Sequence, residues 1–433
     1  MNLITKIAQN MKELVTSSMA ETPTLTDIEQ TTREIMQLVG QETIKLLVQQ
    51  LDPSYPESEL ECDCGAQASY IRRRPATLHT LVGKIKIERA YYLCPSCHQG
   101  TYPLDQKLGL RPNQLSAELS RLAAMTGVEL PFAAGRDLFE ALTLVSISDQ
   151  AMSKATTTIG SRIEQFEKEA TRASIDEALL LEKQREEKPP LRMYGSIDAT
   201  KVHIRDDEEH RWRDLKIGAF YEARGKPPAT PNGKWTIQAE HINYFADICH
   251  VSQFSPLLWA HGVRHNAQLA RELIFVCDGA DWIWNIVEEH FPNAIQILDW
   301  FHASEHLAPV AQAIFIDPNQ ASDWIERMKS FMWDGDISLI LDELDTQRRT
   351  TSDDIIRITA NYFERNKQRM RYAEFRKQGY QIGSGTIESA AKQIGMMRLK
   401  VPGAIWNESS ARKVAKARAE FLSNRWSDLP LAT

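Results

Sequence analysis

The sequence predicts a multidomain protein that combines an α+β part with an α/β part. A chain of 433 residues is longer than a domain built around one hydrophobic core usually is, so two to four domains are expected. A hydrophobic content of 42% and a charged content of 25% are typical of a soluble globular protein. Two patterns separate the parts: four cysteines clustered in a strand-rich segment, and a later series of strands that alternate with helices.

Residues 1–55 are predicted to form a helical N-terminal region. The segment "IEQTTREIMQLVGQETIKLLVQQL" repeats apolar residues at helical spacing. We expect Thr26 to cap this helix, with Glu29 three residues later completing a capping box. The proline-containing segment "DPSYPES" then ends the helix.

Residues 56–110 are predicted to form a zinc-binding ribbon. Short alternating stretches are typical of hairpin strands, and the cysteines follow a C-x-C…C-x-x-C pattern with 29 residues between the pairs. A structural zinc site requires four ligands in a tetrahedron, which two short turns at the ends of a hairpin can supply. A region with so few apolar residues also gains stability from a metal. The predicted zinc ligands are Cys62, Cys64, Cys94 and Cys97.

Two other interpretations of these cysteines remain open, namely unrelated thiols or a redox pair. His79 and His98 are alternative ligands, and His98 is the poorer choice because it directly follows Cys97. The other two cysteines, Cys249 and Cys277, lie in apolar runs and are interpreted as buried thiols.

Residues 111–190 are predicted to form a helical DNA-binding region that ends in a linker. The segment "FAAGRDLFEALTLVSISDQAMSKATTTIG" fits one helix, a short break and a second helix capped near Ser146 or Ser148. This is the layout of a helix-turn-helix, whose second helix enters the major groove of DNA. Any two packed helices give the same pattern, so a purely structural helix pair is the alternative. The segment "EKPP" at residues 187–190 marks the linker.

Residues 191–433 are predicted to form an α/β domain. Three consecutive strands come first, in "LRMYGSIDATKVHIRD", "RWRDLKIGAFYEA" and "WTIQAEHINYFADI". A helix follows, and two strand–helix units then begin at "LIFVC" and "AIQIL". This is the order of a ribonuclease H-like sheet, in which the first and fourth strands lie side by side. Residues 318–378 are expected to be wholly helical.

Two aspartates occupy strand positions that are awkward for a hydrophobic core. Asp198 lies within the first strand and Asp278 follows the fourth, and burying either costs free energy unless it is paired or binds a metal. Glu388 stands in the first turn of a later helix, so in this strand order three acids converge at one edge of the sheet. Such a cluster can hold two Mg²⁺ ions about 4 Å apart for displacement at phosphorus. Taken singly, Asp278 also fits turn chemistry, and Glu388 fits the helix dipole.

Four segments together carry a resemblance to a known family: "GSIDAT", "VCDGADWIW", "ILDWFHASEHL" and "GSGTIESAAKQIGMMRLKVPGAIW". They resemble a bacterial insertion-sequence DDE transposase of the ISKra-type group, which is related to the Mutator-like superfamily. The resemblance covers about residues 191–426. It implies a D-D-E triad of Asp198, Asp278 and Glu388 on a ribonuclease H-like fold, at intervals of 80 and 110 residues. It also implies that the second interval holds a helical insertion, about residues 305–378.

The resemblance further implies that this protein binds the terminal inverted repeats of its element and catalyses DNA strand cleavage and strand transfer. Two Mg²⁺ or Mn²⁺ ions would be held by the triad. Asp299 and His302 match the family's D/C-x-x-H signature, which implies that His302 lies near the active site and contacts the scissile strand. The alternative is an ordinary strand-end histidine with a capping aspartate. His306, one turn later, is either its packing neighbour or a second phosphate contact.

Local positive charge favours a DNA partner, although the net charge is −7. Residues 361–425 hold 14 Lys or Arg against 5 Asp or Glu, and residues 61–111 hold 8 against 4. Solvated basic faces are the alternative. Trp406 is interpreted as a core residue, with base stacking as the alternative. The predicted DNA contacts are Arg72, Arg73, Arg74, Lys392, Arg398 and Lys400.

The predicted partners are double-stranded DNA, at the element ends and the target, and a second copy of the chain. A homodimer or larger assembly is expected because two DNA ends must be held together. No run of about eighteen apolar residues or secretory signal occurs, so a cytoplasmic, nucleoid-associated bacterial protein without a membrane span is expected. A stand-alone nuclease on the same fold and a domesticated DNA-binding protein are the alternative functions. The presence of all three acids favours an enzyme over the latter.

Overall fold

The computed structural model describes residues 11–18, 22–52, 58–205, 211–226, 228–231, 233, 236, 238–350 and 353–428. Its internal contacts divide the chain into two compact units, Met1–Thr156 with Leu429–Thr433, and Thr157–Asp428. The division falls within one helix, α6 (Asp149–Ala173). It therefore does not coincide with the boundaries expected at residues 55, 110 and 190.

In unit 1 a short helix at residues 11–17 is followed by a long helix that packs on an antiparallel sheet. The elements are α2 (Leu25–Leu51), β1 (Glu59–Glu61), β2 (Gln67–Thr80), β3 (Gly83–Leu93), β4 (Gly100–Thr101) and α3 (Pro103–Leu108). The sheet has the order β1-β2-β3-β4. Val48 of α2 shares a core with Leu78 of β2, Ile87 of β3 and Leu104 of α3. The predicted N-terminal helical region and cysteine region therefore share one core, and the cysteine region has a second core of its own around Cys62, Tyr92 and Cys94.

The helix start of α2 differs from the prediction. The Thr24 side chain accepts a hydrogen bond from the backbone N–H of Asp27, and the Asp27 carboxylate accepts one from the backbone N–H of Thr24 at 2.8 Å. The capping box is thus Thr24 with Asp27, and the prediction of Thr26 with Glu29 is wrong. Aspartate can close such a box as glutamate does, so the helix begins two residues earlier.

Three helices follow in unit 1 and confirm the predicted helix, break and helix. They are α4 (Ala117–Glu129), α5 (Phe132–Thr143) and the first part of α6. Ser148 caps α6, since its hydroxyl accepts from the backbone N–H of Ala151 at 3.1 Å. Met152 of α6 packs where a side chain on Gly127 of α4 or Gly135 of α5 would stand. The DNA-binding role of these helices stays a prediction.

Unit 2 contains a five-stranded sheet in the order β7-β6-β5-β8-β9. Its strands are β5 (Arg192–His203), β6 (Trp212–Arg224), β7 (Gln238–Ile248), β8 (Glu272–Cys277) and β9 (Ile295–Leu298). The first three strands pair antiparallel, whereas β5 with β8 and β8 with β9 pair parallel. The expected neighbourhood of the first and fourth strands is confirmed by the pairing of β5 with β8.

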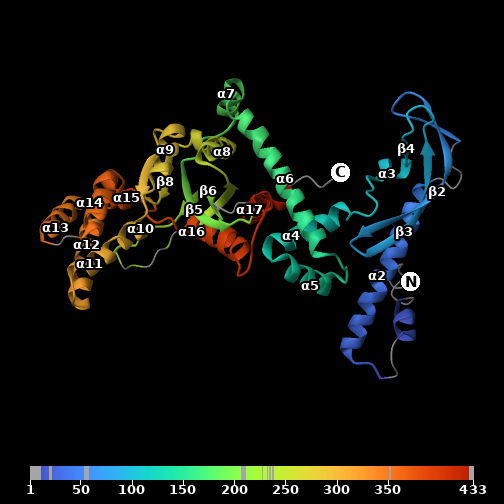
Figure 1. Cartoon of the computed structure of the whole chain (residues 1–433), viewed down its shortest axis with the longest axis horizontal. Helices are drawn as coiled ribbons and strands as arrows, with labels where there is room; N and C mark the ends of the chain where they lie inside the picture. The colour runs from blue at the N-terminus through green and yellow to red at the C-terminus, as the bar shows by residue number, and fades with distance from the viewer. Residues whose placement is uncertain are drawn as a thin grey trace. The chain divides into compact units, whose positions relative to one another are not determined.

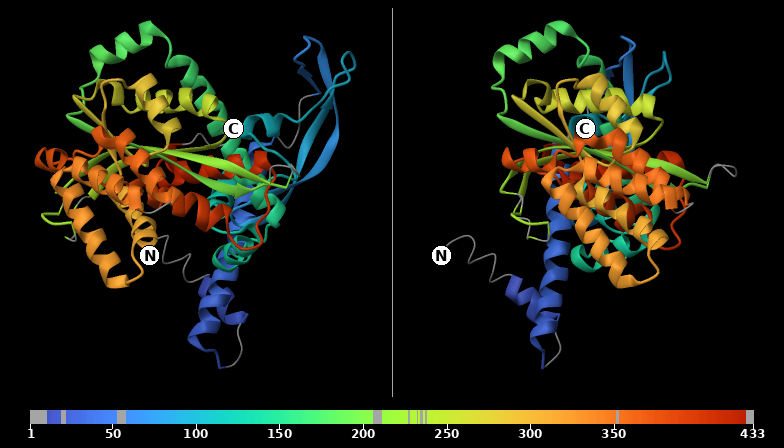
Figure 2. Two further views of the ribbon diagram at one scale, coloured as in Figure 1. Left: turned by 60° about the vertical axis from the view of Figure 1, so that its left-hand side comes forward. Right: turned by 90° about the vertical axis from the view of Figure 1, so that its left-hand side faces the viewer.

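Helices cover both faces of this sheet (Figures 1 and 2). They are α8 (Val251–Arg264), α9 (Asp281–His290), α16 (Gly385–Ala390), the π-helix η3 (Ala391–Leu399) and α17 (Glu408–Leu422). On one face, Phe220 of β6 packs on Phe275 of β8 and approaches Gly262 of α8. On the other face, the Ser196 and Tyr221 hydroxyls lie 3.2 Å apart beneath α16. The strands are therefore buried on both sides.

A buried ion-pair network fixes the second part of α6 to unit 2. The Lys416 ammonium on α17 pairs with Glu167 of α6 and, at 2.7 Å, with Asp247 of β7. At Gly160 a Cβ atom would lie 2.2 Å from the Lys413 carbonyl oxygen, so α6 and α17 approach each other closely. These contacts explain why unit 2 begins inside α6 and not at the linker. Helix α7 (Glu177–Glu186) precedes that linker.

The described part of residues 318–378, which were expected to be wholly helical, consists of helices joined by short turns, and residues 351 and 352 lie outside the described residues. With the helices that lead into it, the segment contains α10 (Trp300–Glu305), α11 (Leu307–Ile314), α12 (Pro318–Asp334), α13 (Ile337–Thr350), α14 (Asp354–Asn366), η2 (Lys367–Arg369) and α15 (Tyr372–Lys377). Its own core includes the fully buried side chains of Trp324, Met328 and Phe363. Two short 3₁₀ turns, η1 (Ala267–Leu269) and η4 (Trp426–Asp428), complete the unit.

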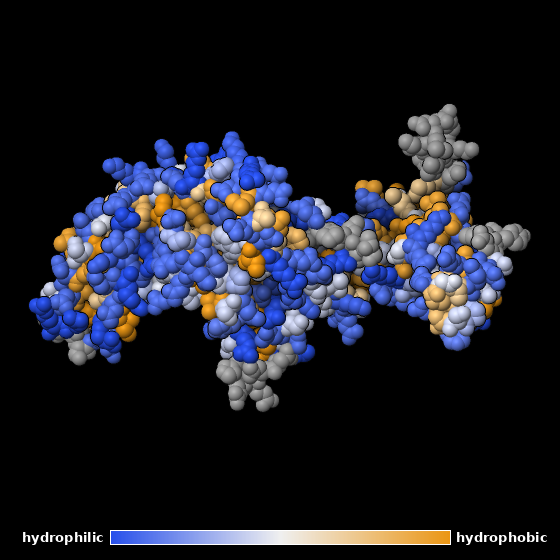
Figure 3. Space-filling model, turned by 90° about the horizontal axis from the view of Figure 1, so that it is seen from above, coloured by the Kyte–Doolittle hydropathy of each residue, from blue (hydrophilic) through white to orange (hydrophobic). Residues whose placement is uncertain are grey.

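The visible surface is mostly hydrophilic, with hydrophobic residues in small patches between charged ones (Figure 3). Among the described residues, no helix has the length and apolar character needed to cross a membrane.

Candidate active site and cysteine cluster

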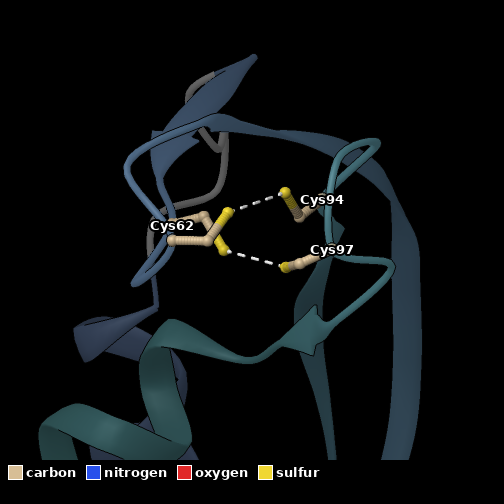
Figure 4. Close-up of side chains that lie close together, drawn as sticks. Cys62, Cys94 and Cys97 are labelled. Atoms are coloured by element: carbon tan, nitrogen blue, oxygen red, sulfur yellow. Dashed lines mark hydrogen bonds between the residues drawn. The ribbon is translucent and has the colours of Figure 1, made fainter.

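The four predicted zinc ligands come together in unit 1. Cys62 and Cys64 lie between β1 and β2, and Cys94 and Cys97 lie between β3 and β4, at the same end of the β2–β3 hairpin (Figure 4). The sulfurs of Cys62 and Cys97 are 3.6 Å apart, as are those of Cys64 and Cys94. All four sulfurs lie within 4.8 Å of one another. The cluster is compatible with a structural zinc site, because sulfurs about 2.3 Å from a tetrahedral zinc lie about 3.8 Å apart. Disulfide sulfurs would lie about 2.0 Å apart.

Tight turns hold these sulfurs in place. The Gly65 N–H donates to the Cys62 carbonyl at 2.8 Å, and the His98 N–H donates to the Cys94 carbonyl at 3.0 Å. Gly65 and His98 both have positive φ, 82° and 57°. The backbone N–H of Cys97 lowers the pKa of Cys94 to about 6, against the opposing effect of burial. At Cys94 this favours the thiolate, which is the form that binds metal, whereas the pKa values of Cys62 and Cys97 are raised.

The alternative histidine ligands lie outside the cluster. His79 is paired with Lys84 in the β2–β3 ladder, and His98 occupies the left-handed turn next to Cys97. Neither belongs to the group of ligand atoms found within the described part of the chain. Cys277 is buried, which confirms its interpretation as a buried thiol, whereas Cys249 is only partly buried.

Asp198 and Asp278 occupy equivalent positions on neighbouring strands. Gly195 of β5 pairs with Phe275 of parallel β8, and each aspartate stands three residues further along its strand. Because side chains alternate between faces, both aspartates lie opposite the face where Phe275 packs on Gly195. The Asp198 carboxylate accepts from the backbone N–H of Ala199 at 2.7 Å. The Asp278 carboxylate accepts from that of Ala280 at 3.0 Å.

Glu388 reaches this face of the sheet from α16. The helix packs on β5 and β6, and the Ser384 hydroxyl lies 3.4 Å from the Glu388 carboxylate as its donor. Gly383 is needed for space, because a Cβ there would lie 3.1 Å from the Phe301 ring. A Cβ on Gly385 would meet no atom of the described structure within 4 Å.

The electrostatic surroundings of Asp198 include the other two predicted acids. The pKa of Asp198 is raised to about 6, chiefly by burial, and the charges of Asp278 and Glu388 contribute to this rise. The Ala199 N–H and His302 act in the opposite direction. Since Coulomb interactions weaken with distance, the three acids and His302 share one neighbourhood, although 190 residues separate Asp198 from Glu388.

The three acids do not form a compact single-ion site in this structure. Within the ranges that are described, only the four cysteines place three or more ligand atoms all within 4.8 Å of one another. The carboxylates of Asp198, Asp278 and Glu388 therefore stand further apart as a set.

Asp299 connects two of the elements that surround the acids. It follows β9, it is 1% exposed, and one carboxylate oxygen accepts from the backbone N–H of His302 at 2.6 Å. The other oxygen accepts from the backbone N–H of Ser384, the residue that precedes α16. Burial raises the pKa of Asp299, and these N–H groups oppose that effect. One side chain thus holds the starts of both α10, with His302, and α16, with Glu388.

The histidines of this segment form an aromatic series that leads to α14. The ring centroids of His302 and His306 lie 5.4 Å apart, edge to face, and His306 stacks on Tyr362 at 4.1 Å. The His302 side chain is 44% exposed. His306 is therefore a packing neighbour of His302, one of its two predicted roles. Tyr362 was not a predicted site residue, because nothing in the sequence distinguishes it from other apolar positions of an amphipathic helix.

The predicted DNA contacts in unit 1 differ in their surroundings. Arg72 is exposed on β2. Arg73 pairs with the buried carboxylate of Asp52, and the Arg74 guanidinium lies over the Tyr91 ring at 3.7 Å. Arg73 and Arg74 therefore contribute to the packing of unit 1.

The predicted DNA contacts near Glu388 also differ. Lys392 and Lys400 are exposed, and the Lys400 ammonium donates to the Thr200 hydroxyl of β5 at 3.2 Å. Arg398 is 1% exposed and lies 5.1 Å from the Trp406 ring centroid. Burial lowers its pKa to about 10. The prediction that Arg398 contacts DNA is wrong for this structure, because its side chain is buried in the core. Trp406 is a core residue, as predicted.

No family model matches the chain, and a search of curated proteins finds no significant match. The functional interpretation therefore depends on the site geometry and on the sequence motifs that occupy it.

Proposed function

We propose that this chain is a DNA transposase of the DDE type, which binds terminal inverted repeats and catalyses divalent-metal-dependent strand cleavage and strand transfer. The observation that carries the proposal is the shared neighbourhood of Asp198, Asp278 and Glu388. They come from a strand, a strand end and a helix, at the spacing that the transposase resemblance requires. The strand order β7-β6-β5-β8-β9, with three antiparallel strands first, is the order of a ribonuclease H-like sheet and supports the same proposal.

The acids of this site have the donor chemistry for Mg²⁺ or Mn²⁺, which prefer carboxylate oxygens. Asp198, Asp278 and Glu388 would supply these carboxylate oxygens, since the three acids share one neighbourhood. When bound, such ions activate the attacking oxygen and stabilise the leaving oxygen.

The neighbouring residues have roles of their own in this proposal. Asp299 would position Glu388 and His302 by holding the starts of their helices. The exposed imidazole of His302 would contact the scissile strand at the edge of the acids. Lys392 and Lys400 would contact flanking phosphates, because they are exposed on the helix that follows Glu388.

Unit 1 would recognise the element ends. The zinc-stabilised hairpin and helices α4 to α6 supply two modules of the kinds that bind DNA, and Arg72 is exposed on the hairpin. Two copies of the chain would hold two ends together. These assignments follow from the transposase proposal.

The experiment incubates the purified chain with duplexes that carry the ends of its own element, a target plasmid and Mg²⁺ or Mn²⁺. Wild type should nick the end and join it to the target, whereas a stand-alone nuclease would cut without joining and a DNA-binding protein would do neither. Asp278→Asn should bind the ends normally and cut nothing. The matched control is Asp281→Asn, since Asp281 lies three residues away but is exposed and paired with Arg365. Full cleavage by Asp278→Asn would refute the triad.

A further inference from the structure

Tyr362 brings an unassigned hydroxyl to the edge of the acidic site. It lies on α14, within the helical insertion, and is 8% exposed. A Cβ atom on Gly279 would lie 2.2 Å from its ring and 2.5 Å from its hydroxyl oxygen. The hydroxyl therefore rests against the residue that directly follows Asp278, and residue 279 must be small.

This hydroxyl has no hydrogen-bond partner among the described residues. Burial raises the pKa of Tyr362, the charges of Asp278 and Asp299 add to the effect, and the nearby Gly279 N–H opposes it. The hydroxyl thus keeps its proton at neutral pH and remains a donor. A buried donor without an acceptor is costly, and such groups are rare unless a ligand or water completes them.

The surroundings hold the ring in place without satisfying the hydroxyl. His306 stacks on the ring at 4.1 Å, and the Gly279 backbone lies against its edge. By contrast, the buried hydroxyl of Tyr372, also from the insertion, donates to the Leu298 carbonyl at 3.1 Å. The Tyr362 hydroxyl is therefore held in a fixed direction beside the acids, with its donor capacity unused.

We propose that Tyr362 is a substrate-binding residue whose hydroxyl donates a hydrogen bond to a non-bridging oxygen of the DNA phosphate at the acidic site. An anionic oxygen is the acceptor that a substrate would bring to this position, and a donor there does not compete with metal ligands. The inference rests on the proposed function and deepens it, since it makes the helical insertion part of the substrate site.

The test compares two variants that each remove one buried hydroxyl. Tyr362→Phe keeps the ring on His306 and deletes only the unpartnered group. The control, Tyr380→Phe, deletes a hydroxyl that donates to Glu272 at 3.2 Å. Glu272 begins β8 whereas Asp278 follows its other end, so this control lies away from the acids.

The two variants should behave in opposite ways. Tyr362→Phe should unfold at the wild-type temperature or above, because it loses no bond, but it should cleave DNA about 10- to 100-fold more slowly. Tyr380→Phe should unfold at a lower temperature and cleave at the wild-type rate. Cleavage by Tyr362→Phe at the wild-type rate would overturn the proposal.

Phosphorothioate substrates distinguish a phosphate contact from an indirect effect. Sulfur accepts hydrogen bonds weakly, so the penalty of Tyr362→Phe should shrink for one diastereomer at the scissile phosphate and persist for the other. An equal penalty on both diastereomers would overturn the assignment. A wild-type chain that cleaves no DNA would overturn both proposals, whereas an active wild type with an unaffected Tyr362→Phe would overturn only this one.

Discussion

The double role of Asp299 gives a quantitative prediction for Asp299→Asn. The carboxylate accepts one backbone N–H from His302 and another from Ser384, and it does so at 1% exposure. An asparagine amide of nearly the same shape has one oxygen, so it can accept only one of these hydrogen bonds. Its NH₂ group would face the other N–H, donor against donor.

The magnitude follows from these two bonds. Losing one hydrogen bond to a charged group costs about 1.5–3 kcal/mol. Burial raises the pKa of Asp299, which means that the ionised carboxylate is itself disfavoured, and removing the charge recovers part of the loss. We therefore expect a net destabilisation of about 1–2 kcal/mol. In a unit of this size that lowers the melting temperature by about 2–4 °C for each kcal/mol.

Calorimetry of the full chain measures this change, together with cleavage of the element ends. The matched control is Asp317→Asn, since Asp317 is an exposed cap that accepts one N–H at 2.9 Å, and asparagine caps a helix equally well. The control should melt and cleave as wild type does, whereas Asp299→Asn should be impaired in both assays because α16 and α10 lose their common support. If Asp299→Asn matched wild type in both, Asp299 would not be acting as an ionised acceptor of two bonds.

The remaining predictions concern the cysteines and the pH dependence of stability. Elemental analysis of the purified protein should find one zinc ion per molecule. Cys94→Ser should lose this zinc, whereas Cys249→Ser should keep it. Equal zinc content in the two variants would contradict a zinc site at the cysteine cluster. The pKa of Asp198 is raised to about 6 in the folded protein, so the protonated carboxyl group stabilises the fold at low pH, and this stabilisation is lost as the pH rises through that value. When a chelator removes divalent ions, the free energy of unfolding of wild type should therefore fall, relative to that of Asp198→Asn, by about 2–3 kcal/mol between pH 4 and 7. Urea titrations measure this, and parallel pH profiles for the two proteins would refute the raised pKa.

The sequence was most informative where a local pattern has one structural outcome. The strand pattern of residues 191–206 predicted β5 and the apolar run LIFVC predicted β8, and in their parallel pairing Asp198 and Asp278 each stand three residues beyond the pair of Gly195 and Phe275. The C-x-C…C-x-x-C spacing likewise predicted a cluster of four sulfurs. In both cases the chemistry depends on residues whose positions follow from strand geometry.

Contacts between distant segments could not be read in the same way. Glu167 and Lys416 stand 249 residues apart, yet their buried pair decides that unit 2 begins inside α6. Arg398 lies in a basic stretch of sequence, but its side chain is buried in the π-helix η3. Tyr362 acquires its position only because the insertion folds back onto Gly279. Tertiary packing, not local propensity, sets each of these.

Binding of Mn²⁺ to zinc-loaded protein, followed by electron paramagnetic resonance, tests the central claim most directly. If Asp198, Asp278 and Glu388 form one divalent-ion site, wild type should bind Mn²⁺ saturably, Asp198→Asn should lose that binding, and Asp281→Asn should retain it. Binding of equal stoichiometry and affinity to wild type and Asp198→Asn would contradict the claim.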